Sequence, residues 1–172
     1  MIIILMGVSG SGKTTVGRCL ADVLDWCFIE GDDLHPRSNV AKMSQGIPLT
    51  DRDRGPWLTR LRDRLVDLRQ QDKSAIVTCS ALKRSYRQIL RPHPNEAIQF
   101  VYLKGSVPLL KSRLHQRQGH FMKAGMLQSQ LTTLEEPDDA IVIDIDTATR
   151  PKQVISDVLA RLNLLPNAEA EG

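Results

Sequence analysis

A short apolar run near the start of the chain leads directly into a glycine-rich loop, and this pair of features constrains the fold most. The run Ile2–Met6 precedes Gly7-Val8-Ser9-Gly10-Ser11-Gly12-Lys13-Thr14, which matches the P-loop pattern G-x-x-x-x-G-K-[ST]. Glycines let successive backbone N–H groups face phosphate oxygens, and the N-terminus of the following helix favours the same anion. The sequence therefore predicts a strand, a phosphate-binding loop and a helix in succession.

Individual residues of this loop have distinct expected roles in binding a nucleoside triphosphate. Lys13 is expected to act in catalysis by bridging the β- and γ-phosphates, and the Thr14 hydroxyl is the expected Mg²⁺ ligand. The dinucleotide-binding pattern G-x-G-x-x-G is excluded because Thr15 takes the place of its third glycine. The expected nucleotide-binding residues are Gly7, Val8, Ser9, Gly10, Ser11, Gly12, Lys13, Thr14 and Thr15.

The chain beyond the loop alternates short apolar runs with stretches of helical periodicity. The apolar runs are too short for typical helices and rich in β-branched residues, so they predict buried strands. Their alternation with helices predicts an α/β fold with a mostly parallel sheet and helices on both faces. We expect a single domain over residues 1–165 and a flexible tail over 166–172. The predicted strands are Ile2–Met6, Cys27–Glu30, Ala75–Cys79, Gln99–Leu103 and Ile141–Ile145.

Composition narrows the classes of function. Hydrophobic residues make up 41% of the 172 residues and charged residues 25%, which is typical of a globular domain. No apolar run approaches the roughly 20 residues of a membrane span, so we expect no membrane partner. A net charge of +3 with only 4% aromatic residues argues against nucleic-acid binding. The three cysteines, Cys19, Cys27 and Cys79, are odd in number and widely spaced, so we expect a cytoplasmic protein without disulfides or zinc.

Two polar stretches do not fit the alternation of strands and helices, and we expect both to be functional loops. Residues 31–56 contain repeated Gly and Pro, and we expect an irregular substrate-binding insertion there. Residues 113–126 are basic, and we expect a mobile lid. Arg113 and Arg117 are four apart, so on a helix they share a face from which they would stabilise the transferring phosphoryl group. The alternative for this basic cluster is a solvated helix face.

Carboxylates directly after the second predicted strand are candidates for the catalytic base. Ligands of open parallel sheets bind beyond the carboxyl ends of the strands, which would bring Asp32 and Asp33 near the γ-phosphate. Asp32 is the preferred acceptor of the proton of the substrate hydroxyl, although an aspartate here can also cap a helix or a turn. His35, beside Pro36, can serve either the substrate or the loop.

The cationic and metal-binding groups are less sharply defined. Arg54 suits a planar carboxylate because its guanidinium binds both oxygens, but it can equally pair with a neighbouring aspartate. The third predicted strand ends at Cys79 without the Walker-B aspartate that commonly assists Mg²⁺ at this place. The metal would then rely on Thr14, phosphate oxygens, waters and, as one option, Asp32.

These pieces, taken together, resemble the bacterial gluconokinase family from the P-loop to about Asp146. The resemblance implies an ATP-dependent kinase that phosphorylates D-gluconate at its 6-hydroxyl to give 6-phospho-D-gluconate, with ATP and Mg²⁺ as cofactors. It also implies a P-loop fold like that of nucleoside monophosphate kinases, with a five-stranded sheet of order 2-3-1-4-5, and a homodimer. The matching stretches include Leu34-His35-Pro36, Arg54-Gly55-Pro56-Trp57, Cys79–Arg87, Gly119-His120-Phe121-Met122, Gln128–Gln130 and Leu134–Pro137.

The resemblance also implies a substrate site, because a six-carbon acid needs a cation, polar groups and a base. Arg54, with Lys83 or Arg84, is the expected partner of the carboxylate. Two alternatives stay open: a kinase of another small hydroxy acid such as shikimate, and a non-catalytic nucleotide-binding switch. The switch would hydrolyse its nucleotide slowly, without stimulation by an acceptor. The expected substrate-binding residues are Asp32, His35, Arg54, Lys83, Arg84 and His120.

Overall fold

A five-stranded parallel sheet forms the centre of the computed structural model, which describes residues 1–93, 95–116, 124–147 and 151–164. Its order is β2-β3-β1-β4-β5, and every neighbouring pair of strands is parallel. The predicted sheet order is therefore confirmed, and the strand bounds differ from the predicted ones by at most one residue at each end. The strands are β1 (Ile2–Met6), β2 (Cys27–Glu30), β3 (Ala75–Thr78), β4 (Ile98–Lys104) and β5 (Ile141–Asp144).

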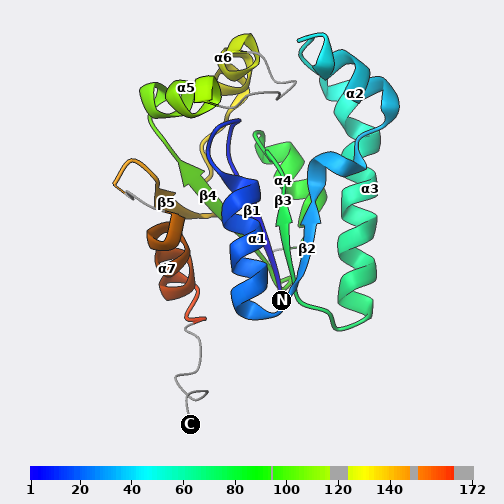
Figure 1. The fold of residues 1–172 in the computed structure, drawn as a ribbon. Coiled ribbons are helices and arrows are strands. Elements are labelled where there is room, and N and C mark those ends of the chain that lie inside the picture. The colour runs from blue at the N-terminus through cyan, green and yellow to red at the C-terminus, as the bar shows by residue number, and fades with distance from the viewer. Residues whose placement is uncertain (94, 117–123, 148–150, 165–172) are drawn as a thin grey trace.

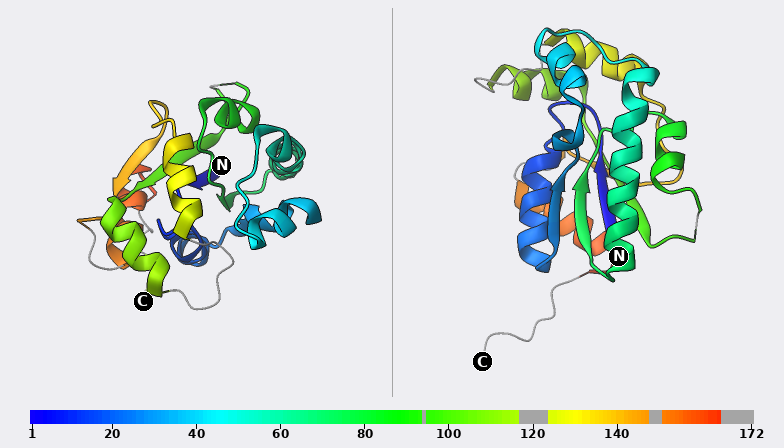
Figure 2. Two further views of the ribbon diagram at one scale, coloured as in Figure 1. Left: turned by 90° about the horizontal axis from the view of Figure 1, so that it is seen from above. Right: turned by 90° about the vertical axis from the view of Figure 1, so that its right-hand side faces the viewer.

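Helices cover both faces of this sheet, as Figure 1 and the right-hand view of Figure 2 show. On one face lie α1 (Lys13–Leu24) and α7 (Pro151–Arg161), and on the other lie α3 (Asp51–Gln70) and α4 (Arg84–Leu90). Among the described residues, no helix is both long and apolar enough to cross a bilayer. The predicted α/β architecture is confirmed, and the boundaries 1–165 remain a prediction.

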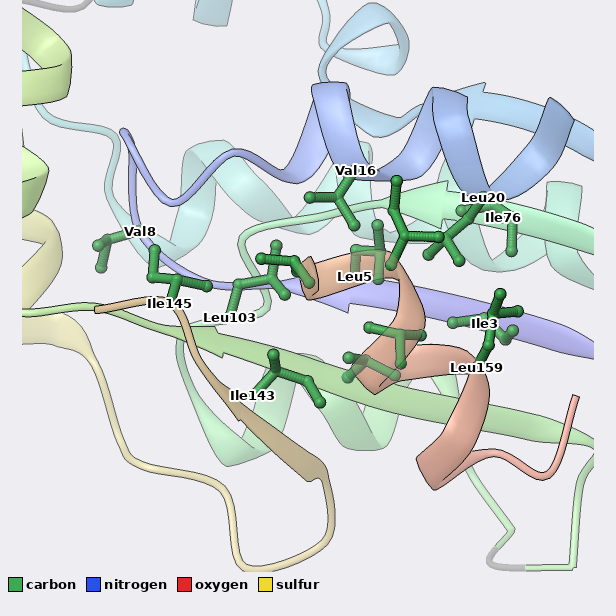
Figure 3. Packing of buried hydrophobic residues seen from close by; sticks show 14 of the residues in the cluster. Ile3, Leu5, Val8, Val16, Leu20, Ile76, Leu103, Ile143, Ile145 and Leu159 are labelled. Atoms are coloured by element: carbon green, nitrogen blue, oxygen red, sulfur yellow. The ribbon is translucent and has the colours of Figure 1, made fainter. Parts of the chain in front are cut away.

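The central strand β1 explains why the core has two halves. All five of its side chains are buried, which is the pattern of a parallel strand covered on both faces. Ile3 and Leu5 pack with α1 and α7, where Figure 3 shows them beside Val16, Leu20 and Leu159. Ile2, Ile4 and Met6 point the other way and pack against α3 and α4. This double burial fixes the end of β1, and with it the start of the P-loop.

The stretch 31–56 is more regular than the sequence predicts. It contains a 3₁₀ turn, η1 (Gly31–Leu34), the helix α2 (Arg37–Ser44) and the start of α3. Thr50 caps α3 and forms a reciprocal capping box with Asp53, which satisfies two N–H groups at the helix start. Pro56 therefore lies inside α3 and does not end it, so the expectation of an irregular loop is wrong.

Three helices lie beyond the carboxyl ends of the strands (Figures 1 and 2). They are α2, α5 (Val107–Gln116) and α6 (Ala124–Thr133). The predicted lid, 113–126, spans the end of α5 and the start of α6, and its central part, 117–123, lies outside the described residues. The predicted tail 166–172 also lies outside them. This end of the sheet is where a ligand of a parallel sheet is expected to bind.

Candidate active site

The P-loop joins β1 to α1 with the backbone shape that phosphate binding requires. Gly10 and Gly12 have φ angles of +86° and +91°, which side-chain-bearing residues rarely adopt. A Cβ atom on Gly10 would also lie 3.0 Å from the carbonyl oxygen of Leu110. Lys13 folds back over the loop, where its Nζ donates to the carbonyl of Gly7 at 2.9 Å and to that of Val8 at 3.2 Å. The loop and its lysine thus form a cationic cradle at the start of α1.

A carboxylate that the sequence analysis did not select lies against this cradle. Glu30, the last residue of β2, accepts a hydrogen bond from the Thr14 hydroxyl at 2.7 Å and another from the Thr78 hydroxyl. Thr78 is the β3 residue paired with Glu30 in the sheet, and it is the last residue of that strand. The signal available in the sequence was Glu30's place at a strand end, one strand away from where a Walker-B acid was expected.

These oxygen groups fit Mg²⁺. The ion usually takes one or two carboxylates together with substrate phosphates and waters, and it does not need a cage made only of protein atoms. Thr14, Glu30 and Asp32 line one pocket with the P-loop and supply hydroxyl and carboxylate oxygens. In the described part of the chain no group of three or more His, Cys, Asp or Glu side chains is placed to hold a metal.

The acceptor side of the pocket is built by η1 and α3. Asp32 lines the pocket with its side chain 41% exposed, whereas Asp33 is exposed and lies outside the pocket lining. The His35 side chain is only 4% exposed, and its Nε2 lies 3.9 Å from Asp32 Oδ1. The His35 ring stacks on Trp57 with ring centres 4.1 Å apart. Of the two aspartates, the structure brings Asp32 to the pocket.

The His35 imidazole is electrically neutral at neutral pH. Burial lowers its pKa from 6.5 to about 4, and the positive charge of Arg54 adds to the effect. A neutral imidazole has one N–H donor and one acceptor nitrogen. His35 therefore contributes to the pocket as a hydrogen-bonding group and not as a cation.

Arg54 is the predicted carboxylate-binding cation that lines the pocket. Its Nη1 donates to the Leu49 carbonyl at 2.6 Å and lies 3.4 Å from the Tyr86 hydroxyl. Tyr86 in turn donates to Asp51. These contacts, both made by Nη1, hold the Arg54 guanidinium near His35.

Lys83 and Arg84 are placed differently from the prediction. Lys83 Nζ lies 2.7 Å from Asp51 Oδ2, and this hydrogen bond raises the pKa of the lysine and lowers that of Asp51. Arg84 is exposed and lies 3.9 Å from Asp138. Lys83, the N-cap of α4, and Arg84, its first residue, therefore lie outside the pocket lining, each against a carboxylate at the surface.

Helices α5 and α6 approach the P-loop from the opposite side. A Cβ atom on Gly12 would lie 3.7 Å from Arg113 Nη1, so this predicted catalytic arginine is beside the loop. From α6, Gln130 Oε1 accepts a hydrogen bond from the Ser9 backbone N–H at 2.7 Å, and Ser129 lines the pocket. Neither was selected as a site residue from the sequence. The predicted residues Arg117 and His120 lie outside the described residues.

A small apolar cluster joins the two sides of the pocket. Met43 from α2, Leu49 from the α2–α3 connection and Met126 from α6 are at most 8% exposed and form a buried cluster of their own. All three line the same pocket as Asp32 and Lys13. The pocket thus combines an anion-binding loop, an acidic group, a cation and an apolar wall.

Curated relatives with known names match nearly the whole chain. A gluconokinase of Gluconobacter oxydans is 49% identical over 158 residues, which cover 91% of this chain and 88% of the relative. The chain belongs to the gluconokinase family. A family model described as an AAA domain also matches residues 2–137. This match agrees with the P-loop at the start of the chain.

Solved structures agree with this family. A gluconokinase from Sinorhizobium meliloti has a TM-score of 0.83 at 46% identity, covering 95% of this chain and 92% of that one. A sugar kinase from Janibacter has a TM-score of 0.87 at 44% identity, covering 99% and 98%. The fold of these two kinases therefore matches nearly the whole of this chain.

Proposed function

We propose that the protein transfers the γ-phosphoryl group of ATP to the 6-hydroxyl of D-gluconate, giving 6-phospho-D-gluconate and ADP. The observation that carries this proposal is that one pocket is lined by the P-loop, by Asp32 and by Arg54. Membership of the gluconokinase family supplies the substrate, since the curated relatives that match the chain carry that name. The likeness to shikimate kinase is at 17% identity and concerns the fold alone, so it does not favour that alternative.

In this proposal each residue of the pocket has a separate role in phosphoryl transfer. Phosphoryl transfer relies on positioning and on stabilising charge more than on covalent chemistry by the protein. Lys13 and the P-loop N–H groups hold the phosphates, and Arg113 offsets the charge that develops during transfer. Asp32 orients the acceptor hydroxyl and takes its proton, and Arg54 binds the substrate carboxylate. The role of Arg117, predicted from its spacing to Arg113, and that of His120, which the family resemblance implies, remain predictions.

Mg²⁺ is part of the same proposal. Thr14 and Glu30 would hold the ion, with Asp32 as a further carboxylate within the pocket. The bound ion would neutralise phosphate charge as the γ-phosphoryl group leaves. In the described structure the Thr14 hydroxyl donates to Glu30, which keeps both oxygens side by side at the mouth of the P-loop.

The experiment that tests the proposal is a coupled assay of ADP release with a panel of acceptors. D-gluconate should stimulate ADP release about 100-fold or more over the rate without acceptor, given the usual size of acid–base and positioning effects. Shikimate and other sugar acids serve as competitors, and ³¹P NMR identifies the product as a 6-phosphate ester. Chelation of Mg²⁺ should abolish turnover. Slow ADP release that no acceptor stimulates would favour a nucleotide-binding switch instead.

The assembly and location of the protein are further parts of the proposal. By analogy with the family we propose a homodimer, and from the odd number and wide spacing of the cysteines a cytoplasmic location. Light scattering of the purified chain tests the first point, and fractionation of the source cells tests the second.

A further inference from the structure

Asn39 contacts the side of His35 that faces away from Asp32. This asparagine lies in α2, is 2% exposed, and does not line the pocket itself. Its Nδ2 lies 2.8 Å from the backbone carbonyl oxygen of Asp53 and 3.2 Å from His35 Nδ1. One buried amide nitrogen therefore joins α2, the start of α3 and the His35 ring.

The chemistry of these three groups decides the direction of each hydrogen bond. The Asp53 carbonyl oxygen can only accept, so the amide group must turn its nitrogen, not its oxygen, toward it. An amide nitrogen carries two hydrogens and accepts none. Its second hydrogen points to His35, so His35 Nδ1 must be the unprotonated, accepting nitrogen.

It follows that the proton of neutral His35 is on Nε2. That nitrogen is the one 3.9 Å from Asp32 Oδ1. Stacking on Trp57 at an interplanar angle of 16° fixes the ring plane, and the Trp57 indole N–H is itself held by the Gly31 carbonyl at 2.7 Å. Asn39 then fixes rotation within that plane. With the opposite tautomer, a lone pair on Nε2 would face the Asp32 carboxylate, and two acceptors would repel each other.

We propose that Asn39 is a positioning residue for recognition of the acceptor, because it locks His35 as the Nε2–H tautomer beside Asp32. The pocket then presents one fixed donor and one acceptor next to each other. An alcohol can satisfy both, since its oxygen accepts from His35 while its hydrogen goes to Asp32. A carbonyl group at that place cannot donate to Asp32, so the pair selects a hydroxyl over a carbonyl. The recognition part of this inference rests on the proposed function; the tautomer does not.

The tautomer is measured directly, without substrate, from long-range ¹H–¹⁵N spectra of protein labelled at its histidines. His35 is assigned among the four histidines by the signal that disappears in the His35→Gln variant. We expect the Nε2–H pattern at neutral pH in the unmodified protein. An Nδ1–H pattern overturns the proposal, even if the enzyme phosphorylates gluconate. An Nε2–H pattern in a protein that phosphorylates no sugar acid overturns the proposed function and upholds the tautomer.

The positioning role is tested with a double-mutant cycle. Glutamine at position 35 can place an amide N–H near the position of Nε2 without help from Asn39. Loss of an oriented hydrogen bond should raise the KM for gluconate roughly tenfold in Asn39→Asp, while the KM for ATP stays unchanged. In the His35→Gln background, the same substitution should change the KM for gluconate less than about twofold. Equal effects in both backgrounds overturn the positioning role.

Two further variants separate positioning from folding. Asn39→Ser removes the contact to His35 without adding a buried charge, and it replaces Asn39→Asp if that variant does not fold. Its His35 spectrum should lose the pure Nε2–H pattern; retention of that pattern overturns the proposal. Ser38→Ala changes the exposed neighbour on the same helix and is the matched control for α2, with wild-type KM for gluconate.

Discussion

Asp32 and Asp33 are adjacent in sequence but differ in their surroundings. Such differences between neighbouring residues decide which side chains can take part in the chemistry of the pocket. Asp32 lines the pocket with the P-loop lysine, whereas Asp33 points away into solvent. The 3₁₀ turn η1 produces this difference, since consecutive residues in such a turn point in different directions. One carboxylate can therefore reach a substrate hydroxyl while its neighbour cannot.

Replacing Asp32 by asparagine should remove the base and keep the shape of the side chain. We expect kcat to fall by about 10²–10⁴-fold, the usual contribution of a positioned acid–base group. The KM for ATP should change little, because the P-loop is intact. Steady-state kinetics of Asp32→Asn and Asp33→Asn, side by side, measure this. Equal losses in the two variants would contradict the assignment of the base to Asp32.

Arg54 and Arg84 provide a second comparison of single residues. Arg54 lines the pocket and Arg84 is exposed outside it. Loss of a charge-assisted contact should raise the KM for gluconate in Arg54→Gln by roughly 10- to 100-fold. Arg84→Gln should leave it within about twofold, as expected for a surface charge. The reverse order would restore Arg84 as the carboxylate partner that the sequence alone allowed.

At the scale of elements, the junction of β2 and η1 depends on a close approach of two strands. A Cβ atom on Gly31 would lie 2.0 Å from the carbonyl oxygen of Thr78, so no side chain fits there without moving β2 away from β3. Gly31 separates Glu30 from Asp32, and its N–H donates to the Thr78 hydroxyl at 3.1 Å. The position of both carboxylates thus depends on this glycine.

Gly31→Ala should lower the free energy of unfolding by about 1–3 kcal/mol or more, the usual cost of overpacking a rigid site. Gly55 is the matched control, because a Cβ atom there would meet nothing within 4 Å. Within the helix α3, Gly55→Ala should instead raise the free energy of unfolding by about 0.5–1 kcal/mol. Urea denaturation of both variants measures these opposite signs. A stable Gly31→Ala protein would show that β2 can shift at little cost.

The helices and strands were predicted from the sequence better than the contacts between them. The exceptions have physical causes. The strands and their order follow from local patterns: apolar runs, the P-loop and the alternation with helices. Pro56 was expected to interrupt structure, but the Thr50–Asp53 capping box starts α3 five residues earlier, at Asp51. Burial of Trp57 and Leu58 stabilises the turn around the proline. The capping pattern was present in the sequence and should have outweighed the proline.

Contacts between elements were harder to predict, because they depend on register and side-chain direction. The pairing of Glu30 with Thr78, and the reach of Gln130 to Ser9, join residues far apart in sequence. Likewise, whether Lys83 faces the pocket depends on the competing Asp51 carboxylate, which only the folded arrangement of α3 and α4 brings near. Asp32, His35 and Arg54 were predicted because motif spacing fixed their elements.

For the molecule as a whole, the buried imidazole of His35 links stability to pH. Its pKa is about 4 when folded and 6.5 when unfolded, so between these values the unfolded chain binds a proton that the native protein does not. Stability should therefore fall as the pH falls from 6.5 to 4. The loss from this group approaches about 3 kcal/mol at the lower end. Arg54 adds to the effect by disfavouring a second positive charge, and Asp32 at 3.9 Å opposes it.

Chemical denaturation of the wild type and His35→Gln at several pH values between 7 and 4.5 measures this contribution. The variant has no imidazole at position 35, so its free energy of unfolding should decline less over this range. The other three histidines, His93, His115 and His120, remain in both proteins, so only the contribution of His35 differs between the two curves. Parallel curves for the two proteins would mean that His35 titrates alike in its folded and unfolded states.

The apolar cluster of Met43, Leu49 and Met126 affects how well water can compete with the substrate as phosphoryl acceptor. Water is itself a phosphoryl acceptor, present at far higher concentration than any metabolite. These three side chains give one wall of the pocket a surface of hydrocarbon and thioether groups, which offers an ordered water few hydrogen-bond partners. In the proposed reaction, such a wall would disfavour hydrolysis of the nucleotide when no sugar acid is bound.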